Sequence, residues 1–270
     1  MIDRTGVLPN QPLFYVLASL RFQRWLSLPN KIADIQDALR ERFPVINQIH
    51  FAEPAQSHAP QNSSTEPAAW AFHTADRSLG CQIMHEQLVV HTTRYTRFSD
   101  FAEVFKFVLE AIEPHIKSFD VGAIGIRYLD RISPRPGEDL SDYLPTEYLP
   151  KTLSAVGFSV ESGLSQTVYK TKTGVLQARF WAGPQYLSVP DDLVPIFVMT
   201  QEFGPAGPVL HPLAQGDGIL DSDSIWSSLT PVRIGIDEAV AKLNALHEHS
   251  NEFFRTVCDE NAFRAWRGEA

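Results

Sequence analysis

Four arginines that are each followed directly by an aromatic residue lie in segments expected to be strands. These pairs are Arg21-Phe22, Arg94-Tyr95, Arg127-Tyr128 and Arg179-Phe180. A guanidinium group binds a carboxylate or a phosphate through two parallel hydrogen bonds. If the four arginines gather on one surface, they would therefore form a site for an anion.

The third pair lies in the most informative segment, residues 121–132, which has the composition of a strand. Neighbouring side chains of a strand point to opposite sides. We therefore expect Tyr128 to face the core and Arg127 to face away from it. Two interpretations stay open. Arg21, Arg94, Arg127 and Arg179 could line a ligand-binding surface together with Asp130, or they could pair with carboxylates such as Asp130 and Glu161 on a solvated sheet face.

Motifs that carry catalysis or bind metals are incomplete. Asp221 and Asp223 resemble the start of a calcium loop, but Ile225 and Trp226 stand where that loop needs an oxygen ligand and a glycine. His247 and His249 lack the spacing of a zinc-binding helix, so His247 is expected to be a partly buried core residue. The nucleophile-elbow and phosphate-loop patterns do not occur. We therefore predict no catalytic residue, no metal and no cofactor.

The composition restricts the partners and the compartment. The 270-residue chain has a net charge of -9, which disfavours nucleic acid and anionic membranes unless basic residues gather on one face. Residues 1–12 lack the features of a signal peptide, and no apolar run is long enough to span a membrane. Cys81 and Cys258 are the only cysteines, which favours a reducing cytoplasm.

The elements that must position these residues alternate between strands and helices. Strands are expected at residues 10–25, 70–74, 80–85, 88–95, 121–132, 157–170, 175–182, 196–203 and 220–223. Helices are expected at residues 27–44 and 99–116 and from Asp237 onward, and residues 53–69 have the composition of a loop. This pattern predicts an α+β fold with a mainly antiparallel sheet and packed helices.

The order of elements suggests an internal repeat. Leu20-Arg21-Phe22 and Ile126-Arg127-Tyr128 occupy comparable places, and each is followed by a helical segment, a meander and a long helix. We predict two related α+β units, residues 1–120 and 121–270, packed as one compact body. Chance similarity of so short a segment is the alternative.

Several short motifs occur in an order that resembles a known family. They are residues 8–10 (Leu-Pro-Asn), 125–132 (Gly-Ile-Arg-Tyr-Leu-Asp-Arg-Ile), 220–223 (Leu-Asp-Ser-Asp), 246–247 (Leu-His) and Trp266. The resemblance is to sporadically distributed, uncharacterised bacterial and archaeal proteins of about this length. It implies an accessory role, such as one in a defence-related system, and assigns no catalytic residue.

Three functions follow as hypotheses. The favoured one is a non-enzymatic protein-interaction module with another protein as its partner. The second is a binder of an anionic ligand or nucleic acid through the arginines. The third is an enzyme whose site forms only in the fold, with Asp130, His247, Asp221 and Asp223 as the residues to watch near Arg127.

Overall fold

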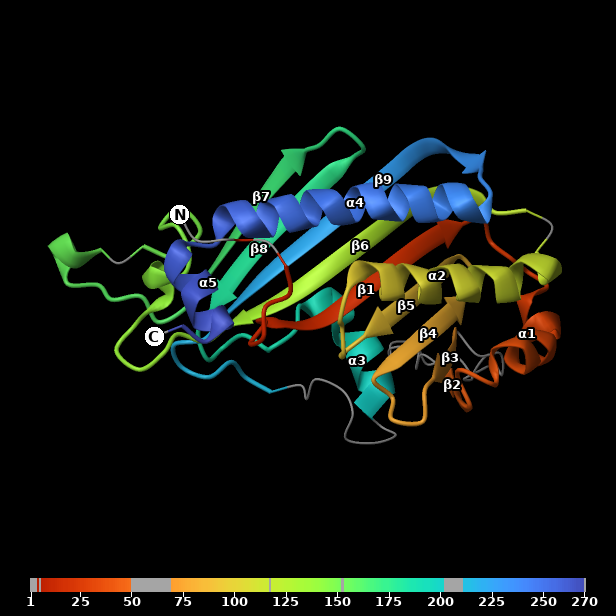
Figure 1. Cartoon of the computed structure of the whole chain (residues 1–270), viewed down its shortest axis with the longest axis horizontal. Coiled ribbons are helices and arrows are strands. Elements are labelled where there is room, and N and C mark those ends of the chain that lie inside the picture. Colours follow the sequence, from red (N-terminus) through yellow and green to blue (C-terminus); the bar gives the residue numbers. More distant parts are fainter. Residues whose placement is uncertain are drawn as a thin grey trace, which may run out of the picture.

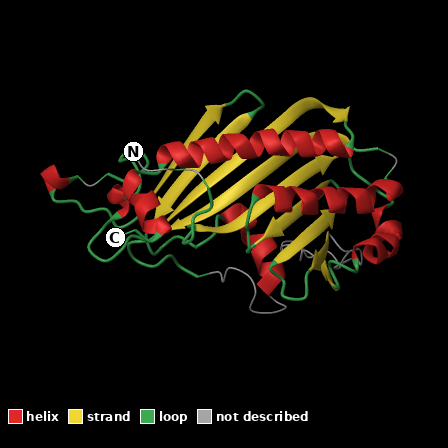
Figure 2. Ribbon diagram, viewed as in Figure 1, coloured by secondary structure: helices red, strands yellow, loops and turns green. Residues whose placement is uncertain are grey.

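One antiparallel sheet of nine strands runs through the whole molecule, in the order β2-β3-β4-β5-β1-β6-β9-β8-β7. The computed structural model describes residue 4 and residues 6–49, 69–116, 118–151, 153–201 and 211–269. Helices lie mainly on one face of this sheet, as Figures 1 and 2 show. The fold is therefore α+β, as the sequence predicts.

The first half of the chain builds one side of the sheet and two of its helices. Its elements are β1 (Leu13–Phe22), the short helix η1 (Leu28–Lys31), α1 (Ile32–Leu39), β2 (Val45–Ile49), β3 (Ala69–His73), β4 (Leu79–Met84), β5 (Gln87–Thr92), α2 (Phe98–Ile112) and η2 (Glu113–His115).

The second half builds the other side. Its elements are β6 (Asp120–Ile132), η3 (Leu140–Asp142), η4 (Ser154–Val156), β7 (Gly163–Lys170), β8 (Val175–Ala182), η5 (Asp191–Leu193), α3 (Val194–Gln201), β9 (Gly218–Arg233), α4 (Ile236–Val257) and α5 (Glu260–Arg267).

The main core lies between the sheet and helices α1, α2 and α4. Every second residue of β1 and β6 faces this core. Among them, Val16 and Ile126 share it with Phe105 of α2 and Leu246 of α4. A smaller apolar cluster covers the opposite face, where Phe197 of α3 packs against Tyr15 and Leu129. Both faces of the central strands are thus buried, and a polar group on either face must find a partner or a cavity.

The two halves meet at the centre of the sheet, where β1 pairs antiparallel with β6. On one side of this pair lie β5, β4 and β3, and on the other lie β9, β8 and β7. Each half thus places its first strand at the centre and its meander outward, ending in a long helix (Figure 1). The proposed relationship between residues 1–120 and 121–270 stays a prediction, and one continuous sheet joins them.

Several boundaries differ from those expected. The strand expected at 196–203 is wrong, because the described part of that segment belongs to helix α3. β9 is 16 residues long and contains the short strand expected at 220–223, and neither β2 nor α5 was predicted. The expected loop at 53–69 lies outside the described residues except for Ala69. None of the described helices is long and apolar enough to cross a membrane.

Candidate functional site

Strand β6 carries polar groups on both of its faces. Its neighbours are β1 and β9, so its side chains can point only toward the helices or toward the opposite cluster. Tyr128 and Asp130 differ by two positions and share the face covered by α4. Arg127 lies on the other face. The strand therefore supplies two separate polar sites.

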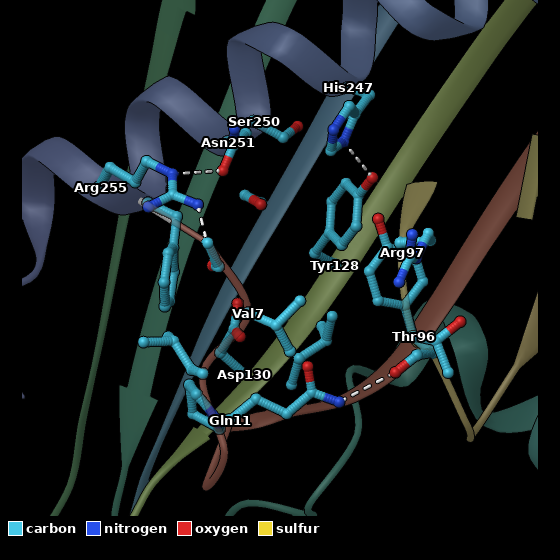
Figure 3. Close-up of a pocket in the computed structure, with 17 residues that line it drawn as sticks. Val7, Gln11, Thr96, Arg97, Tyr128, Asp130, His247, Ser250, Asn251 and Arg255 are labelled. Carbon is cyan, nitrogen blue, oxygen red and sulfur yellow. Dashed lines mark hydrogen bonds between the residues drawn. The ribbon is translucent and has the colours of Figure 1, made fainter. Parts of the chain in front are cut away.

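The first site is a pocket of about 250 Å³ between β6 and α4. Its remaining walls are residues 6–8, residues 11–13, residues 95–97 and Ser222 of β9. Leu8, Leu13 and Phe254 make part of the lining apolar. Ligand-binding pockets usually have volumes of about 300–1,000 Å³, so the volume of this pocket suits a small ligand. Figure 3 shows Asp130 and Tyr128 directed into the same space from neighbouring positions of the strand.

Asp130 is the most unusual group in this lining. Its side chain is only 5% exposed and has no hydrogen bond or ion pair with any residue that the structure describes. Burial raises the pKa of its carboxyl to about 8, and the negative charge of Asp221 acts in the same direction. The carboxyl is therefore protonated at neutral pH and can donate a hydrogen bond into the pocket.

Tyr128 and His247 close the end of the pocket next to α4. The Tyr128 hydroxyl and His247 Nδ1 lie 2.7 Å apart, and the imidazole stacks on Phe98 with ring centres 4.1 Å apart. Burial lowers the pKa of His247 to about 4 and raises that of Tyr128. Both groups are thus neutral at pH 7, and they fix each other's orientation.

The N-terminal segment is tied across the mouth of the pocket. Gln11 Nε2 donates to the Tyr95 carbonyl at 2.9 Å, and the Asn10 backbone N–H donates to the carbonyl of Trp266 at 2.9 Å. Arg255 reaches the Gly6 carbonyl at 3.5 Å. These bonds hold residues 6–11 beside the pocket, so the pocket depends on chain segments that are far apart in sequence (Figure 3).

The second site is an ion-pair cluster on the opposite face of β6. Arg127 is 4% exposed and binds the fully buried Asp221 through two hydrogen bonds of 2.7 Å. Arg179 binds the same carboxylate at 2.7 Å. Asp192 of η5 contacts both arginines, at 2.5 Å from Arg127 and 3.2 Å from Arg179. The cluster joins β6, β8, β9 and η5.

In this cluster, burial and the charge of Arg127 shift the pKa values of the carboxyl groups in opposite directions. Burial raises the pKa of Asp221 to about 6, while Arg127 lowers it. Burial also raises the pKa of Asp223 to about 7. Asp221 and Asp223, which the sequence suggested as part of a calcium loop or an enzyme site, thus lie on β9 and face arginines of other strands. Among the described residues, no group of His, Cys, Asp and Glu side chains is arranged to hold a metal.

The four predicted arginines do not form one group. Arg127 and Arg179 share the cluster, and the charge of Arg21, which is exposed at the end of β1, reaches Asp223. Arg94 was expected in a strand, which is wrong, because β5 ends at Thr92. The Thr92 hydroxyl accepts the backbone N–H of Arg94 and turns the chain there. The Arg94 side chain pairs with Asp76 at 2.8 Å.

Sequence reasoning missed most of the pocket. It named Asp130 and His247, but it treated Tyr128 only as a core residue and named neither Arg97 nor Ser222. The alternation of side chains along β6 does place Asp130 on the face of Tyr128, and this signal was available. The contributions of residues 6–13 and 95–97 had no local signal, because those segments are irregular.

Comparison with known proteins gave no family. No family model matches the chain, and no curated protein matches it. The resemblance to the sporadically distributed family therefore stays a prediction from sequence, and the site is interpreted from its own chemistry.

Proposed function

We propose that the protein binds a small anionic molecule, such as a carboxylic acid with an apolar body, in the pocket beneath α4. The observation that supports this most strongly is the charge of the lining. The charged side chains among the described lining residues are Arg97, Arg255 and Asp130. Because Asp130 is held neutral, it adds no negative charge to the lining at pH 7, whereas Arg97 adds a positive one.

The chemistry of the lining fits such a ligand. A protonated Asp130 donates to an oxygen of the ligand, and the Ser222 hydroxyl can donate beside it. The guanidinium group of Arg97 is mostly exposed and lies 3.9 Å from Asp100, a weak pairing that leaves it able to attract an anion. The apolar body would contact Leu8, Leu13 and Phe254. Binding would take place in the cytoplasm, the compartment that the low cysteine content favours.

The direction of the pH dependence tests this function. Benzoate, hexanoate and butanoate would be compared with benzylamine, hexylamine and butylamine by calorimetry and thermal shift. We expect the acids to bind, with affinity that falls by up to about tenfold per pH unit above pH 8 as Asp130 loses its proton. Amines that bind more tightly as pH rises, or a panel in which no acid binds, would refute the proposal.

Substitutions at Asp130 separate hydrogen bonding from charge. Asp130→Asn keeps a donor at the same place, so we expect it to bind the acid without the pH dependence. Asp130→Leu removes the donor and should weaken binding by about 10- to 100-fold. Asp223→Asn is the matched control, since it makes the same change on the opposite face of the sheet and should leave binding unchanged.

A further inference from the structure

The two edges of the sheet differ in what they expose. β2 is five residues long and mostly half-buried. β7 has eight residues, and every position from Gln166 to Lys170 is exposed. In Figure 1, β7 forms the outer border of the sheet beside β8, with no element along its other side. Its outward N–H and C=O groups therefore lack a neighbouring strand among the described residues.

β7 also lacks the features that usually protect an edge strand. Such strands carry charges, prolines or bulges that prevent pairing with another chain. In β7 the segment from Gly163 to Tyr169 has no charge and no proline, and its pairing with β8 is regular throughout. Leu164 and Val168 are 54% and 57% exposed and share one face. This edge is suited to strand addition.

We propose that β7 pairs antiparallel with β7 of a second copy of this chain, which joins the two sheets into one. A two-fold axis perpendicular to the sheet keeps matching faces together, so paired residues must have numbers of the same parity. With Gln166 on the axis, Leu164 of each copy lies opposite Val168 of the other. Lys170 then lies beyond the paired segment.

The strand itself favours a second copy over a different partner. Leu164 and Val168 are equally spaced from Gln166, so one symmetric register forms two apolar pairs across the interface. No charge is placed against its own copy in this register. With Thr167 on the axis, Lys170 would instead face Leu164, which is a poorer match. The protein partner that the sequence analysis expected is, in this proposal, a second copy of the same chain.

The interface between the two β7 strands buries little surface area, and this limits the affinity of the dimer. A seven-residue strand pair covers less than the roughly 1,600 Å² of a standard interface, so we expect a dimer with micromolar affinity. Each chain carries a net charge of -9. Repulsion between the copies is screened by salt, so association should strengthen as ionic strength rises.

Sedimentation analysis of the full chain over a range of concentrations tests the proposal. We expect a monomer–dimer equilibrium for the unsubstituted protein and a monomer for Val168→Lys. The matched control is Val175→Lys on β8, which adds the same charge on the same face, one strand away from the edge. This control should still dimerise. A dimer that persists in Val168→Lys, or a monomer at all concentrations, would overturn the proposal.

Cross-linking tests the register. Gln166→Cys places two thiols opposite each other at the axis, within the separation of directly opposed residues. Oxidation should link it into a covalent dimer, whereas Thr167→Cys should link poorly. The native cysteines Cys81 and Cys258 are buried and free, so the background is low. Equal or absent linking in both variants would contradict the Gln166 register, and absent linking would also contradict the pairing of β7.

Discussion

Arg127 and Asp130 stand three residues apart on β6 and are almost equally buried, at 4% and 5% exposure. Arg127 has a carboxylate at each side, whereas Asp130 has no hydrogen-bonding or charged partner among the described residues and faces a cavity. A paired buried charge joins structural elements. A buried ionisable group that meets only a cavity lowers stability and is typical of a binding site. The comparison therefore assigns a structural role to one face of β6 and a binding role to the other.

Arg127→Met should cause the largest change in the free energy of unfolding among the substitutions that test this comparison. It leaves the buried carboxylate of Asp221 with Arg179 as its remaining close cation. Removal of one partner from a buried pair costs about 3–5 kcal/mol. The free energy of unfolding in urea measures the loss. Arg21→Met, at an exposed arginine of the same face, is the control and should change stability by less than about 0.5 kcal/mol. A loss below about 1 kcal/mol for Arg127→Met would show that the cluster is not structural.

Asp130→Asn should change stability in the opposite direction. The pKa of Asp130 is raised from 3.8 to about 8, so the folded state keeps a proton that the unfolded chain releases between these pH values. The contribution of Asp130 is fully present below about pH 4 and is lost as pH rises toward 8. Asparagine does not ionise, so the variant should be more stable than the unsubstituted protein at pH 8, by roughly 1–3 kcal/mol, and similar at pH 4.

Denaturant titrations at pH 4, 6 and 8 measure this difference. If the substitution destabilises the protein equally at every pH, Asp130 has a structural partner and the contrast with Arg127 fails.

His73 and His91 sharpen the comparison, because they are buried on the face of Arg127 and their ring nitrogens have no hydrogen bond to any described residue. Burial lowers the pKa of His73 to about 4 and that of His91 to about 3. The unfolded chain binds protons below about pH 6.5, so stability is present above that pH and falls as pH decreases toward 4. His91→Phe keeps the ring and should reduce this acid loss by roughly 1–2 kcal/mol at pH 5. An unchanged pH profile would contradict the low pKa.

Asp192→Asn should have the smallest effect. This carboxylate is 55% exposed at the end of the cluster, so solvent screens its attraction to Arg127 and Arg179. We expect a loss of about 0.5–1 kcal/mol that disappears in high salt. Unfolding measured at low and high ionic strength tests it. If Asp192→Asn lowers the free energy of unfolding as much as Arg127→Met does, the contacts of η5 with the cluster contribute a large part of the stability.

Elements with strong local patterns were predictable. The strand at 175–182 has the bounds of β8, and that at 121–132 differs from β6 by one residue. Alternating or continuous apolar residues specify such strands locally. The segment at 196–203 was predicted wrongly because a short apolar run fits a strand or a buried helix equally well. There Pro195 lies in the first turn of α3, a position that suits the start of a helix.

The sequence by itself determined the α+β class, the central strand and the opposite orientation of Arg127 and Tyr128, because alternation along a strand is a local property of the backbone. The tertiary structure decided which charges are paired. Asp221 reaches Arg127 only because β9 lies beside β6, and Asp130 faces a cavity only because α4 and residues 6–13 leave space above it. The solvation and pairing of a charge depend on chain segments brought together by folding, which no local pattern specifies.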